Sequence, residues 1–272
     1  MLRENLREDT VGDLLSVGLD GDSDEYFVVN PSEATVSALV DVLEASPEPP
    51  TVRLFAAESA LKELMDDFLV ASAVADLMDD GTLAVRTLTS VPNNALLLSP
   101  ESVVSLVDSG DGVAGLTTTA DSFVASTYDH YDARWKRAPE FSLRTPPRSR
   151  VMETLKADIG ADTAADFAGV LDSLESARGD GQGLDEVTIS LLVAARNGEL
   201  LYDISKWGED VGLASKATFS RTKTRLEDTG LIETEKVPID VGRPRLRLMP
   251  GDSRLQEATV EDIAGVAKEQ LA

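Results

Sequence analysis

The most constraining feature of the chain is a pattern near its carboxyl end that fits three short helices followed by a hairpin. Residues 184–195 carry apolar side chains at helical spacing behind Asp185, a residue type that caps helices. A shorter apolar stripe over 203–211 ends at Gly212, which tolerates the positive φ of a tight turn. A third helix is predicted over 215–229. This order favours a compact α+β domain at 184–250.

The hairpin is predicted directly after the third helix, which stops at Gly230. Two strands, over 231–237 and 245–248, are joined by a turn at 238–242. The return strand alternates arginine with leucine, so its leucines face inward and its arginines outward. The hairpin therefore predicts a basic wing over 236–247. Its cationic residues are Lys236, Arg243, Arg245 and Arg247.

Charge is distributed unevenly between this region and the remainder of the chain. The sequence holds 25 basic and 49 acidic residues, for a net charge of −24. Residues 184–250 hold 10 basic and 11 acidic residues, which leaves 15 and 38 elsewhere. The stretch 215–226 holds four basic residues and no acidic one. Pooling of positive charge in an acidic chain indicates a surface that contacts nucleic acid.

The third helix separates into two faces. Phe219, Thr222 and Leu226 share one face and are predicted to point into the core. Small and hydroxyl residues on the other face would let the backbone approach a DNA groove, and arginine can donate two bonds to guanine. Arg221 and Arg225 are the best candidates for base or phosphate contacts. The DNA-binding residues predicted on this helix are Lys216, Ala217, Thr218, Ser220, Arg221, Thr224 and Arg225. The alternative is an ordinary solvated helix face.

The first half of the chain alternates strand-like and helix-like segments, which predicts an α/β domain with a largely parallel sheet. A small-molecule effector, if one binds, is expected at the carboxyl ends of the strands, near 30–32, 56–59 and 90–94. Single residues there are more simply explained as helix caps. The predicted strands are 26–30, 51–56, 83–88, 95–98 and 103–107, and the predicted helices are 31–44, 58–78 and 122–136.

Composition and the positions of proline and glycine divide the chain into four predicted segments. A proline pair at 146–147 marks the first boundary, and the glycine-rich run 178–183 marks the second. The apolar stripes of 150–177 could pair two subunits or pack on their own domain. A terminal helix over 253–272 could likewise pack on the winged domain or on a second subunit. The segments are an α/β sensor or dimerisation domain at 1–145, a helical linker at 146–183, the winged domain at 184–250 and a terminal helix at 251–272.

Several chemistries lack the residues they need. The chain has no cysteine, which excludes thiol catalysis and cysteine-rich metal sites. It has a single histidine, His130, and a metal site built on histidine needs several clustered ligands, so a hydrogen-bonded structural role is the expectation for His130. Neither a GxSxG elbow, a Walker A loop nor a GxGxxG fingerprint is present. We therefore expect no catalytic residues, no metal and no cofactor. Since no signal sequence or membrane-length apolar run is present, we expect a cytoplasmic protein without membrane contact.

Two resemblances support this interpretation. The run TFSRTKTRLEDTGLIETEKV…GRPRLRL resembles the winged-helix domains of bacterial and archaeal repressors. The whole chain, including MLRENLREDTVGDLLSVGLDG and YFVVNPS, is similar to haloarchaeal TbsP-type transcriptional regulators. This resemblance implies an amino-terminal α/β domain, a carboxy-terminal DNA-binding domain and a role in metabolic gene control alongside TrmB-type sugar-responsive regulators. The scattered acidity is also typical of proteins from organisms that keep molar salt in the cytoplasm, and the alternative is an ordinary acidic protein of a mesophile.

These observations predict a sequence-specific regulator of transcription. The expected partners are double-stranded DNA, a second copy of the chain and, if the α/β domain is a sensor, a small-molecule effector. Genes of central carbon metabolism are the expected targets. The main alternative is a protein–protein module whose winged helix does not bind DNA. That alternative predicts an acidic or apolar third-helix face, which the sequence does not have.

Overall fold

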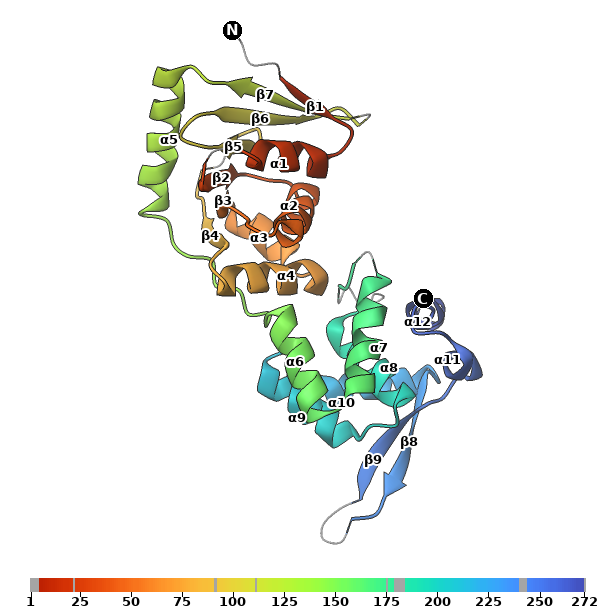
Figure 1. Ribbon diagram of the computed structural model, residues 1–272. Helices are drawn as coiled ribbons and strands as arrows, with labels where there is room; N and C mark the ends of the chain where they lie inside the picture. The colour runs from red at the N-terminus through yellow and green to blue at the C-terminus, as the bar shows by residue number, and fades with distance from the viewer. Residues whose placement is uncertain are drawn as a thin grey trace. The chain divides into compact units, whose positions relative to one another are not determined.

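The computed structural model describes residues 5–21, 23–90, 92–110, 112–174, 176–178, 184–239 and 244–271 (Figure 1). The chain forms two compact units. Unit 1 comprises Met1–Met65 and Ala73–Leu143, and unit 2 comprises Asp66–Ser72 and Arg144–Ala272. Among the described residues, no helix combines the length and apolarity that crossing a membrane requires.

Unit 1 is built on a seven-stranded mixed sheet with the strand order β1-β7-β6-β5-β2-β3-β4. Only β2–β3 and β3–β4 are parallel, and the other four pairings are antiparallel. The prediction of a largely parallel sheet is therefore wrong. The strands are β1 (Leu6–Glu8), β2 (Glu25–Val29), β3 (Thr51–Ala56), β4 (Leu83–Thr87), β5 (Leu96–Leu98), β6 (Val103–Asp108) and β7 (Val113–Thr118).

Helices cover both faces of this sheet (Figure 1). Neighbouring leucines of β5 point to opposite faces of the sheet. Leu97 lies against Gly18 of the helix Val11–Leu19, whereas Leu98 belongs to the core beneath the helix Asp121–Trp135. The predicted single helix over 58–78 is wrong, because it is divided in two by a turn after residue 64. The helices that begin in this half are α1 (Val11–Leu19), α2 (Glu33–Ala45), α3 (Glu58–Leu64), α4 (Phe68–Asp79) and α5 (Asp121–Trp135).

The core beneath α5 is aromatic. Trp135 packs against Phe27 and Phe55, with ring centroids 5.8 and 5.1 Å apart, respectively. The guanidinium of Arg53 lies over the Phe27 and Trp135 rings and pairs with Glu25 at 2.6 Å. The ion pair with Glu25 neutralises the positive charge that Arg53 of β3 places next to the aromatic rings.

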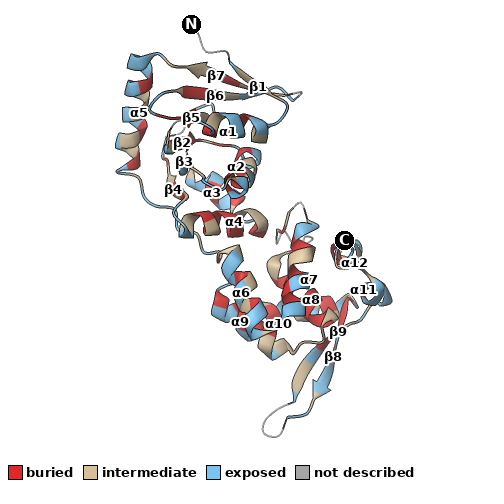
Figure 2. Cartoon of the chain, in the orientation of Figure 1, coloured by how far each residue is buried: buried red, intermediate tan, exposed pale blue. Residues whose placement is uncertain are grey.

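Unit 2 contains three central helices, a two-stranded sheet and flanking helices on a single core. Its elements are α6 (Arg148–Asp158), α7 (Ala161–Asp172), α8 (Glu186–Arg196), α9 (Leu201–Val211), α10 (Lys216–Asp228), β8 (Ile232–Val237), β9 (Arg245–Pro250), α11 (Ser253–Glu257) and α12 (Ile263–Leu271). The middle of α8 is buried on all sides, from Val187 to Ala195, and Figure 2 colours these residues red. The structure thus has an α/β unit and a winged helix-turn-helix unit, as the sequence predicts.

The flanking helices share this core. Val151 of α6, Phe167 of α7 and Ile263 of α12 are all buried in the same apolar cluster as α8. Trp207 of α9 donates a 3.0 Å hydrogen bond from Nε1 to Thr154 Oγ1 of α6. Helices α6 and α7, which lie in the segment 146–183 expected as a helical linker, thus pack on the same core as the three central helices. The helical pattern of 150–177 corresponds to two helices, α6 and α7, and the single terminal helix predicted over 253–272 is divided into α11 and α12.

Candidate nucleic-acid interface

The third helix of unit 2, α10, is positioned by signals close to it in the sequence. Ser215 caps its first turn by accepting a 3.2 Å hydrogen bond from the Thr218 amide. Gly212 and Gly230 adopt the positive φ angles of 92° and 75° that the turns on either side require. Because both turns suit glycine, the predicted start and end of this helix are confirmed.

The inner face of α10 packs closely on α9. Phe219 and Leu226 are fully buried. Gly208 of α9 lies directly against the Phe219 ring, since a Cβ at this glycine would come within 2.3 Å of ring carbon Cε2. The absence of a side chain at Gly208 therefore sets how closely the two helices approach.

The outer face of α10 carries most of the predicted contact residues. Arg221 Nη2 lies 3.4 Å from Thr218 Oγ1, and Lys216 Nζ forms a 2.8 Å ion pair with Glu209 of α9. Hydrogen bonding within this pair raises the pKa of Lys216 and lowers that of Glu209. The exposed members are Lys216, Ala217, Ser220, Arg221 and Thr224, and Thr218 is half-buried.

Two basic residues of α10 point into the unit instead of away from it. Arg225 Nη2 donates a 2.9 Å hydrogen bond to Thr188 Oγ1 of α8. Arg225 Nε is buried and finds no hydrogen-bond acceptor among the described residues. Lys223 forms a 2.6 Å ion pair with Glu227, one helical turn away, and its side chain is only 13% exposed. Arg225 thus links α10 to α8, and the Lys223–Glu227 pair lies within α10 itself.

The wing strands β8 and β9 are antiparallel, with Glu235 opposite Arg247 and Lys236 opposite Leu246. Leu248 is fully buried and Arg247 is exposed, as the alternation predicts. Lys236 is also exposed. Arg243 lies outside the described residues.

Arg245 is held differently from the other wing cations. Its Nη1 pairs with Asp203 of α9 at 2.9 Å, and its guanidinium lies 4.1 Å from the centroid of the Tyr202 ring. The aromatic contact and the ion pair together fix the direction of the side chain. Arg245 therefore joins β9 to the start of α9.

A hollow of about 460 Å³ opens between α9, α10 and the wing. Tyr202 and Ile239, two of the large apolar side chains that remain exposed, line it together with Lys216, Ser220 and Arg245. Sequence reasoning missed Tyr202 and Ile239. They are far apart in the chain, and only the return of the wing onto α9 brings them together.

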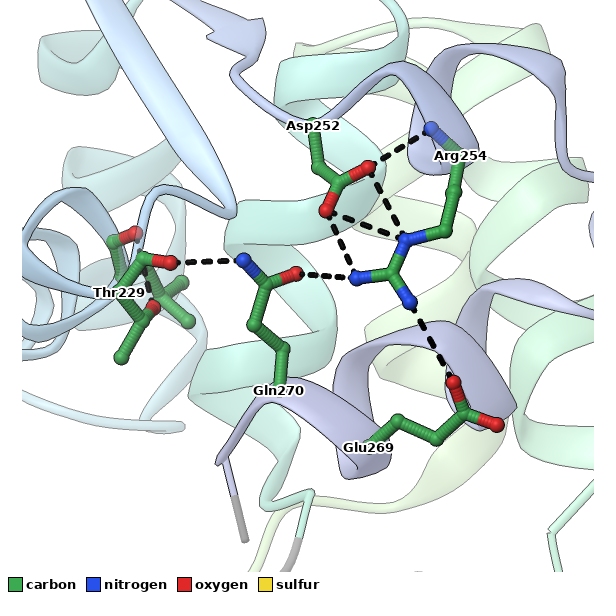
Figure 3. A network of polar contacts seen from close by, with 6 residues as sticks. Thr229, Asp252, Arg254, Glu269 and Gln270 are labelled. Carbon is green, nitrogen blue, oxygen red and sulfur yellow. Dashed lines mark hydrogen bonds and ion pairs between the residues drawn. The ribbon is translucent and has the colours of Figure 1, made fainter.

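The end of α10 is supported by the terminal helices (Figure 3). Gln270 of α12 donates a 2.8 Å hydrogen bond from Nε2 to the carbonyl oxygen of Thr229, the residue that caps α10. Its Oε1 accepts a 3.1 Å bond from Arg254 of α11, which pairs with Asp252 at 2.9 Å. Of the two alternatives for the terminal segment, the structure shows packing on its own winged unit.

Charge balance divides the predicted cations into two groups. Lys216 and Arg245 each have a carboxylate partner. Within the part of the chain that the structure describes, Arg221, Lys236 and Arg247 form no ion pair. Those three side chains carry the uncompensated positive charge of this surface and can attract an anionic partner.

The carboxyl ends of the parallel strands in unit 1 carry ordinary structural contacts. Ser32 caps α2 by accepting a 3.1 Å hydrogen bond from the Thr35 amide. Asn30, which adopts a positive φ of 52°, donates a 2.9 Å bond to the carbonyl oxygen of Pro92. For these two residues the simpler explanation, a structural role, accounts for the side chain.

Comparisons with known proteins match both halves of the chain. Residues 3–146 match the family model of the TbsP-like transcriptional regulator amino-terminal domain, and residues 147–268 match that of the TbsP-like carboxy-terminal HTH domain. No curated protein matches. Among solved structures, TrmBL2, an archaeal chromatin protein whose structure is described as showing a novel mode of DNA binding, is similar with a TM-score of 0.37 and 13% identity. That similarity covers 52% of this chain and 54% of TrmBL2.

Proposed function

The chain belongs to the family of TbsP-like transcriptional regulators, and we propose that α10 is the helix with which it reads DNA. The protein is a DNA-binding regulator of transcription and not an enzyme. What remains to be assigned is the surface that contacts DNA, the residues that read bases and the genes under control.

The observation that carries the proposal is the exposed face of α10. It presents Lys216 and Arg221 among small and hydroxyl side chains, with no acidic residue from 215 to 226. In a chain of net charge −24, such a face is the opposite of what composition alone would produce. A helix of this kind fits the major groove, where arginine can pair with guanine and hydroxyl groups allow close approach.

Roles follow from how each side chain is held. Arg221 reads a base edge, because it is exposed and has no carboxylate partner among the described residues. Ala217, Ser220 and Thr224 line the approach to the groove. Lys236 and Arg247 of the wing contact phosphates, which fixes the register of the protein on the duplex. Arg225 positions α10 through Thr188 and does not touch DNA.

The wing base supplies a further contact. Arg245 is held by Asp203 and Tyr202, beside the hollow that Ile239 also lines. A side chain fixed in this way loses little conformational entropy on binding. Arg245 therefore contacts the phosphate backbone next to the groove, with Tyr202 against the sugar. Arg243, which precedes β9 in the sequence, adds a further cation for phosphate contact.

The broader assignments rest on the family resemblance. The protein acts as a homodimer in the cytoplasm of a halophilic archaeon, responds to a small-molecule effector and controls genes of central carbon metabolism. At molar salt the Debye length is roughly 3 Å, so counterion release contributes little to affinity. Direct contacts and shape fit would then dominate, and rising KCl would weaken binding less than it does for ordinary repressors.

Genome-wide DNA binding in the native host tests the function. Discrete promoter peaks with a shared motif are expected, together with binding of that motif by purified protein in molar KCl. Arg221→Ala should abolish preference for the motif, whereas Arg137→Ala, which removes an exposed arginine from unit 1, should not. A folded, abundant protein without promoter peaks would refute the proposal and favour the protein–protein module.

A further inference from the structure

Exposed apolar side chains gather on one face of unit 1. Val107, Leu116 and Phe123 are 38%, 51% and 53% exposed, and they are three of the six large hydrophobic residues left exposed in the described part of the chain. All three come from β6, β7 and the start of α5. Large apolar residues concentrated on one face usually mark an interaction surface.

The register of the sheet explains how the face forms. Leu96 of β5, Ser105 of β6 and Leu116 of β7 lie opposite one another in a cross-strand row. In the next row Val107 lies opposite Ala114, and Ala114 lies opposite the exposed Arg7 of β1 at the edge of the sheet. Side chains in such rows point to the same side of a sheet, which here is the side of α5. Val124, Tyr131 and Trp135 of α5 pack in the aromatic core, which reaches as far as Leu98 and Val103. Leu116 and Phe123 lie outside that core and remain exposed, so this end of the sheet stays open.

The helix contributes a matching stripe. Phe123, Ser126, Thr127 and His130 are spaced three or four residues apart and line a hollow of about 540 Å³ with Leu96 and Leu116. None of the residues that line this hollow is charged. Charged residues make up 27% of the chain, so an uncharged surface of this extent contrasts with the composition.

We infer that this face, formed by β5–β7 and the Phe123–His130 stripe of α5, binds the same face of a second copy of the chain. A two-fold interface places each patch against its own copy, so a charged patch would meet like charge. Two molecules of net charge −24 repel one another over most of their surfaces. The residues that line the hollow, including Leu116 and Phe123, are uncharged, so two copies can approach there and bury apolar area without that penalty.

This inference rests on the proposed function only in one respect: a dimer would present two copies of α10 to two half-sites of an operator. The face itself belongs entirely to unit 1. Dimerisation and DNA contact therefore use different residues, and each can be disrupted without the other.

The test is the mass of the full-length protein in solution, measured by sedimentation equilibrium at low and at molar KCl. We expect twice the chain mass of 29.1 kDa, with tighter association in molar KCl because salt screens the repulsion. Leu116→Asp and Phe123→Asp should each weaken association at least tenfold. Val17→Asp is the matched control, because Val17 is 49% exposed on α1 and lies outside this face.

The NMR signals of His130, which lines the proposed face, give a second and local test of association. His130 is the chain's only histidine, so its ring protons give one assignable set of NMR signals. Those signals should move with protein concentration in the wild type and stay fixed in Leu116→Asp. A monomeric wild type at all concentrations would overturn the inference. So would a dimer that survives both substitutions with unmoved His130 signals.

Failure of this inference differs from failure of the proposed function. The Leu116→Asp monomer should still bind a duplex that carries a single half-site, and Arg221→Ala should still dimerise. If the folded wild type does not bind a half-site duplex, the proposed role of α10 is contradicted, whereas the inference about the dimer face is unaffected.

Discussion

Arg225 Nη2 and Thr188 Oγ1 lie 2.9 Å apart, and this hydrogen bond joins α10 to the buried helix α8. The bond spans 37 residues of sequence. It orients α10 from its inner side, whereas Arg221 projects from the outer side. The two arginines are therefore expected to respond differently to the same substitution.

Arg225→Ala should lower the free energy of unfolding by about 1–3 kcal/mol, because it removes a partly buried hydrogen bond and a packed side-chain stem. Arg221→Ala should change it by less than about 0.5 kcal/mol, as exposed substitutions usually do. Chemical denaturation in molar KCl measures both. Equal stability of the two variants would contradict the positioning role of Arg225.

Removing the carboxylates beside the proposed DNA-reading surface should strengthen DNA binding. Asp203→Asn and Glu209→Gln release Arg245 and Lys216 from their ion pairs and remove negative charge that repels phosphates. The Tyr202 ring still holds the Arg245 guanidinium after Asp203→Asn, so the direction of that side chain is kept. We expect a several-fold gain in affinity at low salt that disappears in molar KCl, where the Debye length is roughly 3 Å. Fluorescence anisotropy with a labelled operator measures this. Asp121→Asn, in unit 1, is the control, and a loss of affinity in the two test variants would contradict the expectation.

Gly208→Ala should destabilise unit 2. The added methyl group would overlap the Phe219 ring at 2.3 and 2.4 Å, and overpacking of a core typically costs about 1–3 kcal/mol. Gly265→Ala in α12 is the matched control, because nothing lies within 4 Å of its new Cβ. In that variant, better helix propensity should add up to about 1 kcal/mol. Thermal unfolding of both variants tests the pair, and a Gly208→Ala protein as stable as the wild type would be evidence against this contact.

Glu186 should make stability fall as the pH rises toward neutrality. Burial raises the pKa of Glu186 from 4.5 to about 7, in a hollow of about 110 Å³ lined by Phe68, Pro146 and Leu213. The native state therefore holds this proton more tightly than the unfolded chain does. The stabilisation is complete below pH 4.5 and is lost as the pH rises through 7.

Glu186→Gln should remove this dependence, and it should gain about 1–3 kcal/mol over the wild type near pH 8. Denaturation curves across the range measure the difference. Glu153→Gln, which changes an exposed glutamate of α6, should keep the wild-type pH profile. A Glu186→Gln profile parallel to the wild type would show that the carboxyl group is already ionised in the native protein.

The parts of the fold that the sequence predicts are those set by local signals. Ser215, Gly212 and Gly230 define the ends of α10 through capping and backbone conformation, which neighbouring residues determine. The Arg–Leu alternation of β9 likewise predicts which side of the wing is buried. In each case a few consecutive residues carry enough information to fix the element.

The rest depends on contacts between distant residues. Whether β5 runs parallel or antiparallel to β2 is decided by the return of the chain, and nothing within Leu96–Leu98 records it. Strand β1 is three residues long and becomes recognisable only when paired with β7. The inward direction of Arg225 depends on Thr188, and sequence spacing alone places this arginine on the outer face of α10.

The two tryptophans give the chain a natural pair of spectroscopic reporters. Trp135 is buried in the aromatic core of unit 1, and Trp207 is buried in unit 2 with its indole nitrogen bonded to Thr154. Replacing either one by phenylalanine leaves the emission of a single unit to be followed. Each half of the molecule can then be watched separately as it loosens, binds or responds to salt, without attaching a dye to a chain that has no cysteine to accept one.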